Sequence, residues 1–297
     1  MPVSAIRTIC REWLPRCLAV LVVLLAGWTA CAMAADSPDP FINLEKRLIE
    51  DGFDQARIQA IFSSENVSFE KGGVSAYFMH NEAKLNYKQF TRIWNISAAK
   101  SYMQTHQAAL ETAQQTYGVD KEVITAIILV ETKLGKFTGK RSVINTLSTL
   151  SAMADQAPRQ VIWENLPDND RRMTRPQFEK KADRKSSWAY RELKAFLTYT
   201  EKQGMDPTTI KGSYAGAMGI SQFMPSNIAP YGRDGNADGK IDLFVHADAI
   251  SSIASYLKHY GWKPGISREK AFKVVYHYNH SKYYVNTILD IADKLKG

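Results

Sequence analysis

Residues 123–135 read VITAIILVETKLG, an apolar run that ends with a single carboxylate, Glu131. The apolar residues of this run would fall on more than one side of a helix. The run therefore predicts a helix that is buried on more than one side. Gly135 is a typical residue at the C-terminal end of a helix. The stretch therefore predicts a core helix that carries Glu131 in its last turn.

The position of Glu131 allows two interpretations. Most carboxylates are solvated, so Glu131 could be the first solvent-facing residue after a buried helix. Alternatively, apolar neighbours and the negative end of the helix dipole disfavour the charged form and raise the pKa of the carboxyl group. A raised pKa is what a general acid needs near neutral pH. This stretch alone leaves both interpretations open.

The composition of the 297 residues is that of a globular protein, with 45% hydrophobic and 23% charged residues. This length suffices for one large domain or two modest ones. The formal net charge is +8, and it would be +6 without residues 1–35, which contain three Arg and one Glu. A moderately basic protein fits an anionic polymer or a membrane surface as partner. The sequence contains no nucleic-acid-binding motif, phosphate-binding loop or Gly-x-Ser-x-Gly motif, so we expect no nucleic acid partner.

Residues 1–35 have the pattern of a signal peptide, which predicts an exported protein. The features are the basic residues Arg7, Arg11 and Arg16, the apolar residues 17–28, and the small-x-small cleavage site Ala32-Met33-Ala34. A retained anchor is the alternative, although the apolar run is short for a spanning helix. A lipid anchor on Cys31 is another alternative, although the residues before it match a lipidation site poorly. All three cysteines lie in this segment, so the mature chain would have no disulfide.

Amphipathic patterns in the rest of the chain predict a mainly α-helical protein. Helices are expected near residues 44–49, 55–62, 98–117, 141–153, 187–203, 247–260, 270–278 and 284–295. Asp120 is expected to cap the helix that carries Glu131. Residues 84–96 fit either a helix or a strand, and the polar residues 158–184 are interpreted as a long surface excursion.

Residues 212–225, GSYAGAMGISQFMP, are rich in glycine and predict turns. Small residues would let a ligand approach the backbone closely, with Ser213, Tyr214 and Gln222 as polar groups beside it. A tightly packed helical turn would use the same residues equally well. The stretch therefore marks a candidate binding site without deciding its role.

Residues 234–242, DGNADGKID, match the start of a calcium-binding loop. The candidate ligands are Asp234, Asn236, Asp238 and the backbone carbonyl of Lys240. The twelfth position of such a loop, where glutamate belongs, is Val245, but Asp248 could take its place in a longer loop. Runs of this kind also form ordinary surface turns. If a metal binds, we expect a structural Ca²⁺ ion.

The last informative stretch is residues 276–284, YHYNHSKYY, in which aromatic rings surround Asn279. Stacking rings and an amide suit a sugar-binding site. The C-terminal region also contains four histidines, His246, His259, His277 and His280. They could suggest zinc, but none belongs to a His-Glu-x-x-His pair, so zinc is disfavoured.

Taken in order, these motifs resemble those of the lytic murein transglycosylases of the B type, bacterial enzymes that cleave peptidoglycan. The matching motifs are Val130-Glu131-Thr132 with Gly135, residues 212–225, residues 234–242, and Tyr278-Asn279 with Ser281 and Tyr284. The resemblance covers about the last 180 residues. It implies a lysozyme-like core over residues 101–297, with an EF-hand-like calcium loop at residues 234–248. Residues 36–100 would form a helical N-terminal region.

The resemblance also implies roles for individual residues. Glu131 would be the sole catalytic acid and base, and Asp248 would close an unusually long calcium loop. The residues expected around the bound glycan are Ser213, Gln222, Tyr256, Tyr278, Asn279 and Tyr284. No substrate residue of the family could be aligned within residues 155–184.

The implied reaction cleaves the β-1,4 bond between N-acetylmuramic acid and N-acetylglucosamine without water, and leaves a 1,6-anhydro product. It needs no organic cofactor. The implied setting is cell-wall turnover or remodelling in the periplasm, with outer-membrane association as an option. The partners would be glycan strands and other cell-wall enzymes. The competing class is an exported module without enzymatic activity that binds peptidoglycan or calcium.

Overall fold

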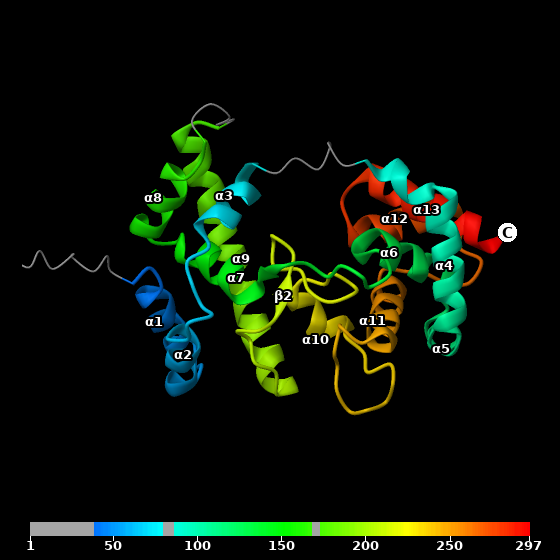
Figure 1. Cartoon of the computed structure of the whole chain (residues 1–297), viewed down its shortest axis with the longest axis horizontal. Helices are drawn as coiled ribbons and strands as arrows, with labels where there is room; N and C mark the ends of the chain where they lie inside the picture. Colours follow the sequence, from blue (N-terminus) through cyan, green and yellow to red (C-terminus); the bar gives the residue numbers. More distant parts are fainter. Residues whose placement is uncertain (1–38, 80–85, 168–172) are drawn as a thin grey trace, which may run out of the picture. The chain divides into compact units, whose positions relative to one another are not determined.

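The computed structural model describes residues 39–79, 86–167 and 173–297 (Figure 1). The predicted signal peptide, the retained anchor and the lipidated Cys31 lie outside the described residues and stay predictions. Among the described helices, none combines the length and the apolar character that a membrane crossing requires.

The described residues are mainly α-helical, as the sequence predicts. The α-helices are α1 (Ile42–Glu50), α2 (Gln55–Phe62), α3 (Lys71–Met79), α4 (Ile93–Thr105), α5 (Gln107–Tyr117), α6 (Lys121–Thr132), α7 (Val143–Ala152), α8 (Gln156–Glu164), α9 (Arg175–Gln203), α10 (Ile228–Tyr231), α11 (His246–His259), α12 (Arg268–Tyr278) and α13 (Lys282–Lys296). Two 3₁₀-helices, η2 (Tyr87–Thr91) and η4 (Pro225–Asn227), and two short strands, β1 (Arg141–Ser142) and β2 (Lys211–Gly212), complete the described elements. The predicted boundary at residue 100 falls inside α4.

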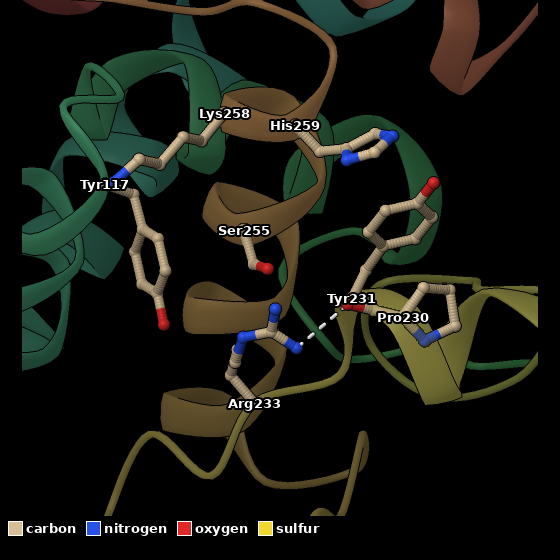
Figure 2. A pocket seen from close by; sticks show the side chains of 7 residues that line it. All are labelled: Tyr117, Pro230, Tyr231, Arg233, Ser255, Lys258 and His259. Atoms are coloured by element: carbon tan, nitrogen blue, oxygen red, sulfur yellow. Dashed lines mark hydrogen bonds between the residues drawn. The ribbon is translucent and has the colours of Figure 1, made fainter.

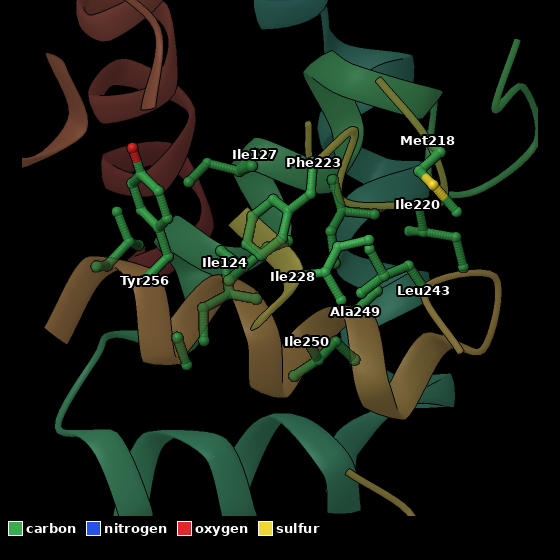
Figure 3. Close-up of a cluster of buried hydrophobic side chains, with 14 of the residues drawn as sticks. Ile124, Ile127, Met218, Ile220, Phe223, Ile228, Leu243, Ala249, Ile250 and Tyr256 are labelled. Carbon is green, nitrogen blue, oxygen red and sulfur yellow. The ribbon is translucent and has the colours of Figure 1, made fainter. Parts of the chain in front are cut away.

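Helix α6 lies in the larger of two hydrophobic clusters, as its apolar pattern predicts. It packs against α4, α5, α11 and α13. Seven consecutive residues of α6, from Val123 to Leu129, are buried, so no face of the helix is left fully solvated. Figure 3 shows part of this cluster, where Ile124 and Ile127 gather with Phe223 and Tyr256. Burial of this extent fixes the direction of the helix end that carries Glu131.

A second hydrophobic cluster joins α3, α7, α8 and α9, and it shows that one prediction is wrong. The segment interpreted as a surface excursion, residues 158–184, contains most of α8 and the first part of α9. Its apolar residues Ile162 and Phe178 are fully buried. Arg159 is also buried, because its guanidinium pairs with the carboxylates of Glu179 and Asp183. Charged residues that pair in this way made a helical segment look solvated.

Three smaller predictions are also resolved. In the described part of residues 84–96, the chain forms η2 and then enters α4, so no strand forms there. Asp120 stands at the N-cap of α6 but its side chain makes no cap hydrogen bond. Its carboxylate instead accepts a hydrogen bond from Lys296 at 2.5 Å. Helix α6 ends at Thr132, before the predicted stop at Gly135.

The two strands bring the chain after α6 to the glycine-rich stretch. Strands β1 and β2 pair antiparallel, with Arg141 opposite Gly212. Gly139, just before β1, has φ +107°, and a Cβ atom there would lie 2.0 Å from the carbonyl oxygen of Gly212. Only glycine allows both this backbone angle and this approach. The close approach of Gly139 to Gly212 joins the segment that follows Glu131 to the start of residues 212–225.

Candidate active site

Glu131 lies in the last turn of α6 and is half-buried. Its Oε1 atom accepts a hydrogen bond of 2.6 Å from the hydroxyl of Tyr284, a residue of α13 with 1% of its surface exposed. Glu131 is thus partly exposed and also hydrogen-bonded to a buried side chain, and its catalytic role stays a prediction. The carboxylate lies at the edge of the core, where a buried hydroxyl from the C-terminal helix α13 donates a hydrogen bond to it.

The backbone after Glu131 turns sharply out of the helix. Two residues without the freedom of glycine, Lys133 and Leu134, have φ angles of 52° and 64°, and Gly135 follows at 80°. A positive φ is uncommon for such residues, and strained backbone of this kind clusters at functional sites. The side chain of Thr132 supports the turn, because its Oγ1 accepts a hydrogen bond of 3.0 Å from the N–H of Gly135.

Three consecutive carbonyls, those of residues 219–221, join the predicted motifs into one site. Gln222 donates from Nε2 to the first carbonyl at 2.9 Å and to the carbonyl of Thr138 at 3.0 Å. The Oγ1 atom of Thr132 lies 3.2 Å from the second carbonyl, and the hydroxyl of Tyr278 donates to the third. The helix of Glu131, the glycine-rich stretch and the C-terminal aromatic stretch are thus tied to one backbone segment.

The remaining residues expected around a glycan occupy different environments. Ser213 is half-buried, and its Oγ accepts hydrogen bonds from the N–H groups of Ala215 and Ala217. Asn279 is also half-buried, and within the described residues its side-chain amide has no hydrogen-bond partner. Tyr256 is only 5% exposed, and its hydroxyl donates to the carbonyl of His277 at 2.7 Å. Contact of Ser213, Asn279 and Tyr256 with a glycan stays a prediction.

The phenols of Tyr278 and Tyr284 keep their protons at physiological pH. Burial raises the pKa of both groups well above the ordinary value, and the negative charge of Glu131 raises both further. Each phenol therefore acts as a hydrogen-bond donor, Tyr284 toward Glu131 and Tyr278 toward Ser221. The geometry gives the carboxylate a fixed neighbour that cannot take its proton.

Sequence reasoning missed several residues around this site. Tyr87 of η2 meets the ring of Tyr284 edge to face, with 6.3 Å between ring centroids. Tyr77 of α3 lies 5.8 Å from the ring of Tyr214, which follows Ser213. The ammonium group of Lys185 lies over the ring of Tyr77 at 4.9 Å. The spacing of aromatic residues in the ambiguous segment 84–96 was the available signal for Tyr87, whereas nothing in the pattern pointed to Lys185.

The predicted calcium loop is closed by its own hydrogen bonds. The carboxylate of Asp234 accepts from the N–H groups of Asp238 and Gly239 at 3.2 and 2.7 Å. Asn236 donates to Asp238 at 2.9 Å, and Asp238 accepts from the N–H of Lys240 at 2.8 Å. In the part of the chain that the structure describes, no three His, Cys, Asp or Glu side chains are grouped closely enough to hold a metal ion.

Asp248, the predicted closing ligand, is fully buried in the first turn of α11. Its two carboxylate oxygens accept from the N–H groups of Gly235 and Asp242 at 2.9 and 2.7 Å. Burial raises the pKa of this carboxyl group, and the charges of Asp234 and Asp238 act in the same direction, while the two N–H groups oppose them. The loop therefore concentrates negative charge around hard oxygen atoms.

Comparison with known proteins places this geometry in context. The family described as transglycosylase SLT domain matches residues 38–269. The chain is 31% identical over 242 residues to membrane-bound lytic murein transglycosylase B of Escherichia coli (strain K12), an alignment that covers 78% of this chain. It spans 59% of the length of that relative.

Two solved structures are similar over most of their length. The soluble lytic transglycosylase SltB1 from Pseudomonas aeruginosa superposes with a TM-score of 0.69 and 25% identity, over 85% of this chain and 97% of that chain. The Escherichia coli lytic transglycosylase Slt35 in complex with calcium gives a TM-score of 0.69 and 25% identity, over 87% of this chain and 93% of that chain. These neighbours support the expected lysozyme-like helical fold.

Proposed function

Because the chain belongs to the transglycosylase SLT family, we propose that it is a lytic transglycosylase that cleaves the glycan strands of peptidoglycan. The observation that carries the proposal is the pairing of Glu131 with Tyr284 at 2.6 Å, at the end of a buried helix. A carboxyl group at the edge of an apolar core, oriented by a buried donor, has the features of a general acid.

In the proposed reaction, the protonated Glu131 first donates its proton to the glycosidic oxygen between N-acetylmuramic acid and N-acetylglucosamine. The bond from this oxygen to the anomeric carbon breaks, and its electron pair leaves with the N-acetylglucosamine. The 2-acetamido group of the muramic acid stabilises the anomeric carbon, which is how a single carboxylate can suffice where most glycosidases use two.

Glu131 is now a carboxylate and acts as the base in the second step. It removes the proton of the 6-hydroxyl group of the same muramic acid, and the hydroxyl oxygen bonds to the anomeric carbon. The product carries a 1,6-anhydro ring, Glu131 is protonated again, and no water is consumed. The apolar residues of α6 would help to exclude water from the anomeric carbon.

Digestion of purified sacculi tests this assignment. We expect mass spectrometry of the soluble products to show 1,6-anhydro muramic ends. Reducing muramic ends, heavier by one water molecule, would show a hydrolytic muramidase in place of a transglycosylase. Turnover by catalytic amounts of protein also separates an enzyme from a module that only binds the wall.

The hydroxyl of Tyr284 gives a sharper test, because Tyr284→Phe removes one donor and leaves the buried ring. A hydrogen bond to a charged group contributes about 1.5–3 kcal/mol, so cleavage should slow by roughly 10- to 100-fold. Its neighbour Tyr283 is 70% exposed, which makes Tyr283→Phe a matched control that should keep full activity. The measurement is the initial rate of muropeptide release as a function of pH. Equal rates for the two variants would exclude Tyr284 as a positioning residue for Glu131.

We also propose that the loop of residues 234–248 binds Ca²⁺ with a structural role. The donor set fits this ion, because Asp234, Asn236 and Asp238 offer hard oxygen atoms at alternate positions. Gly239 has the positive φ of 85° that the sixth position of such a loop requires. A cation would also offset the concentration of negative charge around Asp248. The solved relative Slt35 is described in complex with calcium.

Calcium should therefore raise the thermal stability of the protein. At a free calcium concentration of about 100 times Kd, binding to the folded state adds about 2.7 kcal/mol to the free energy of unfolding. Chelation should lower Tm, and Mg²⁺ at the same concentration should restore it less well, because Mg²⁺ gives up its water reluctantly. Asp234→Asn should reduce the calcium effect. An identical Tm with calcium and with a chelator would contradict the proposed site.

The cellular setting that we propose is the periplasm. Residues 1–35 carry the pattern of an export signal, and a relative with 31% identity is described as membrane-bound. Fractionation of cells, with the intact mass of the recovered protein, distinguishes a cleaved form from an anchored or lipidated one.

A further inference from the structure

A polar pocket lies where the end of α5 meets α10 and α11, and Glu131 is not among its lining residues (Figure 2). Its volume is about 360 Å³. The lining residues are Tyr117, Pro230, Tyr231, Arg233, Ser255, Lys258 and His259. None of them has a role in the proposed reaction, and none is a predicted ligand of the calcium loop.

The guanidinium of Arg233 supplies the main charge of this pocket. Its Nη1 atom donates to the carbonyls of Pro230 and Gly232 at 3.0 and 2.7 Å, which fixes the orientation of the group. Within the described residues, the edge formed by Nε and Nη2 has no partner, and Arg233 makes no ion pair. A guanidinium edge that is fixed and unpaired is suited to a carboxylate, which it binds through two parallel hydrogen bonds.

The hydroxyl of a largely buried serine faces the same space. Ser255 is 6% exposed, and its side chain makes no hydrogen bond to any described residue. Figure 2 shows this hydroxyl directed between the Arg233 guanidinium and the Tyr231 ring. The oxygen itself is open to the pocket, so a ligand or a water molecule can bind to it. The hydroxyl and the guanidinium edge together offer three donors to one acceptor group.

The rest of the lining favours a single negative charge next to a small apolar group. The ammonium group of Lys258, another lining residue, donates to the carbonyl of Thr116 at 3.2 Å and lies 5.8 Å from the ring of Tyr117. Among the basic lining residues Arg233, Lys258 and His259, Arg233 is the one that offers a two-donor edge, which matches the two oxygen atoms of a carboxylate. The rings of Tyr117 and Tyr231, with Pro230, provide apolar walls that a methyl side chain could contact.

We propose that this pocket binds the C-terminal carboxylate of a short peptide of the cell-wall polymer, as a contact that is separate from cleavage. The choice of a cell-wall peptide rests on the proposed function, whereas the choice of a peptide carboxylate rests on the pocket. Tyr231 packs edge to face against Tyr256 at 4.8 Å, and Tyr256 packs against Tyr278 at 5.1 Å. A row of rings thus connects the pocket with the site of Glu131.

The probe for this site is N-acetylated trialanine with a free C-terminal carboxylate, compared with the same peptide as its C-terminal amide. Backbone NMR of the whole protein is expected to show shifts of the amides around Arg233 and Ser255 with the carboxylate form. The amide form should bind at least about tenfold more weakly, because it loses the charged hydrogen bonds. Equal affinity of the two forms would overturn the proposal. Stronger binding of inorganic phosphate or of anionic lipid vesicles at these residues would overturn it as well.

Three variants test the residues involved. Arg233→Lys keeps the charge but loses the two-donor edge, so binding should weaken at least about tenfold. Ser255→Ala should weaken it less, and the exposed Lys263, outside the pocket, gives Lys263→Gln as a control that binds normally. Unchanged affinity in Arg233→Lys would exclude the pocket. These measurements involve no cleavage, so peptide binding in a protein that fails to digest sacculi would remove the proposed function and leave the carboxylate site.

Discussion

Glu131→Gln is expected to lower the release of soluble fragments from sacculi by about 10³-fold or more, because it removes the only group that donates and then accepts the proton in the proposed reaction. The amide keeps the size of the side chain and can still accept a hydrogen bond from Tyr284. We therefore expect the fold to be unchanged. The rate is measured as the initial release of anhydro-muropeptides, with Tm as the measure of folding.

The same helix offers a matched control for this variant. Glu122 lies in the first turn of α6, at the opposite end from Glu131. Glu122→Gln makes the same chemical change to the same helix, and it should keep both activity and Tm. Substantial cleavage by Glu131→Gln would exclude the mechanism with a single carboxylate. Loss of activity in both variants would instead point to a general effect of charge on α6.

The sequence was sufficient to predict the setting of Glu131. Uninterrupted apolar residues from Val123 to Leu129 predicted a buried helix, and the structure confirms this burial. The stretch alone could not show whether Glu131 has a partner, because that partner is Tyr284, which is 153 residues away. The hydrophobic periodicity of a single segment gives no information about this contact. Before the structure was considered, only the resemblance of the ordered motifs to a known family assigned both residues to one site.

The errors have physical causes of the same kind. Segment 158–184 looked solvated because its charges were counted one by one, yet Arg159 is buried through pairs with Glu179 and Asp183. The expected cap of α6 failed because Asp120 has a different partner, Lys296 at the end of the chain. Arg159 lies in α8 and its partners lie in α9, although all of them belong to one segment, whereas Asp120 and Lys296 are 176 residues apart. Propensity and periodicity describe one helix at a time, so they do not predict pairs between helices.

Residues 219–221 show a further limit of reasoning from segments. Gln222 was expected at the glycan, but its amide nitrogen holds the carbonyls of Thr138 and Gly219. Thr132 and Tyr278 hold the next two carbonyls. The motifs that seemed to be separate binding elements therefore also support one another. We infer that variants of these side chains will change the position of the backbone near Glu131 as well as any direct contact with substrate.

Gly139→Ala is the second large effect that we expect, and it concerns stability. Gly139 has φ +107°, a conformation that alanine rarely adopts, and its new Cβ atom would lie 2.0 Å from the oxygen and 2.1 Å from the carbon of the Gly212 carbonyl. Both atoms belong to backbone, so no side chain can rotate away. The pairing of Arg141 with Gly212 must then open. Strain and clash together should lower the free energy of unfolding by about 4 kcal/mol.

Another glycine separates the two causes of this effect. Gly265 also has a positive φ, +68°, but a Cβ atom there would meet nothing within 4 Å. Gly265→Ala therefore measures backbone strain alone and should lower the free energy of unfolding by only about 1 kcal/mol. Urea denaturation of both variants gives the comparison. Since β1 and β2 connect the chain after Glu131 to residues 212–225, Gly139→Ala should also lose cleavage under conditions where it is still folded. Equal free energies of unfolding for the two variants would mean that the close approach of Gly139 to Gly212 does not stabilise the fold around the site.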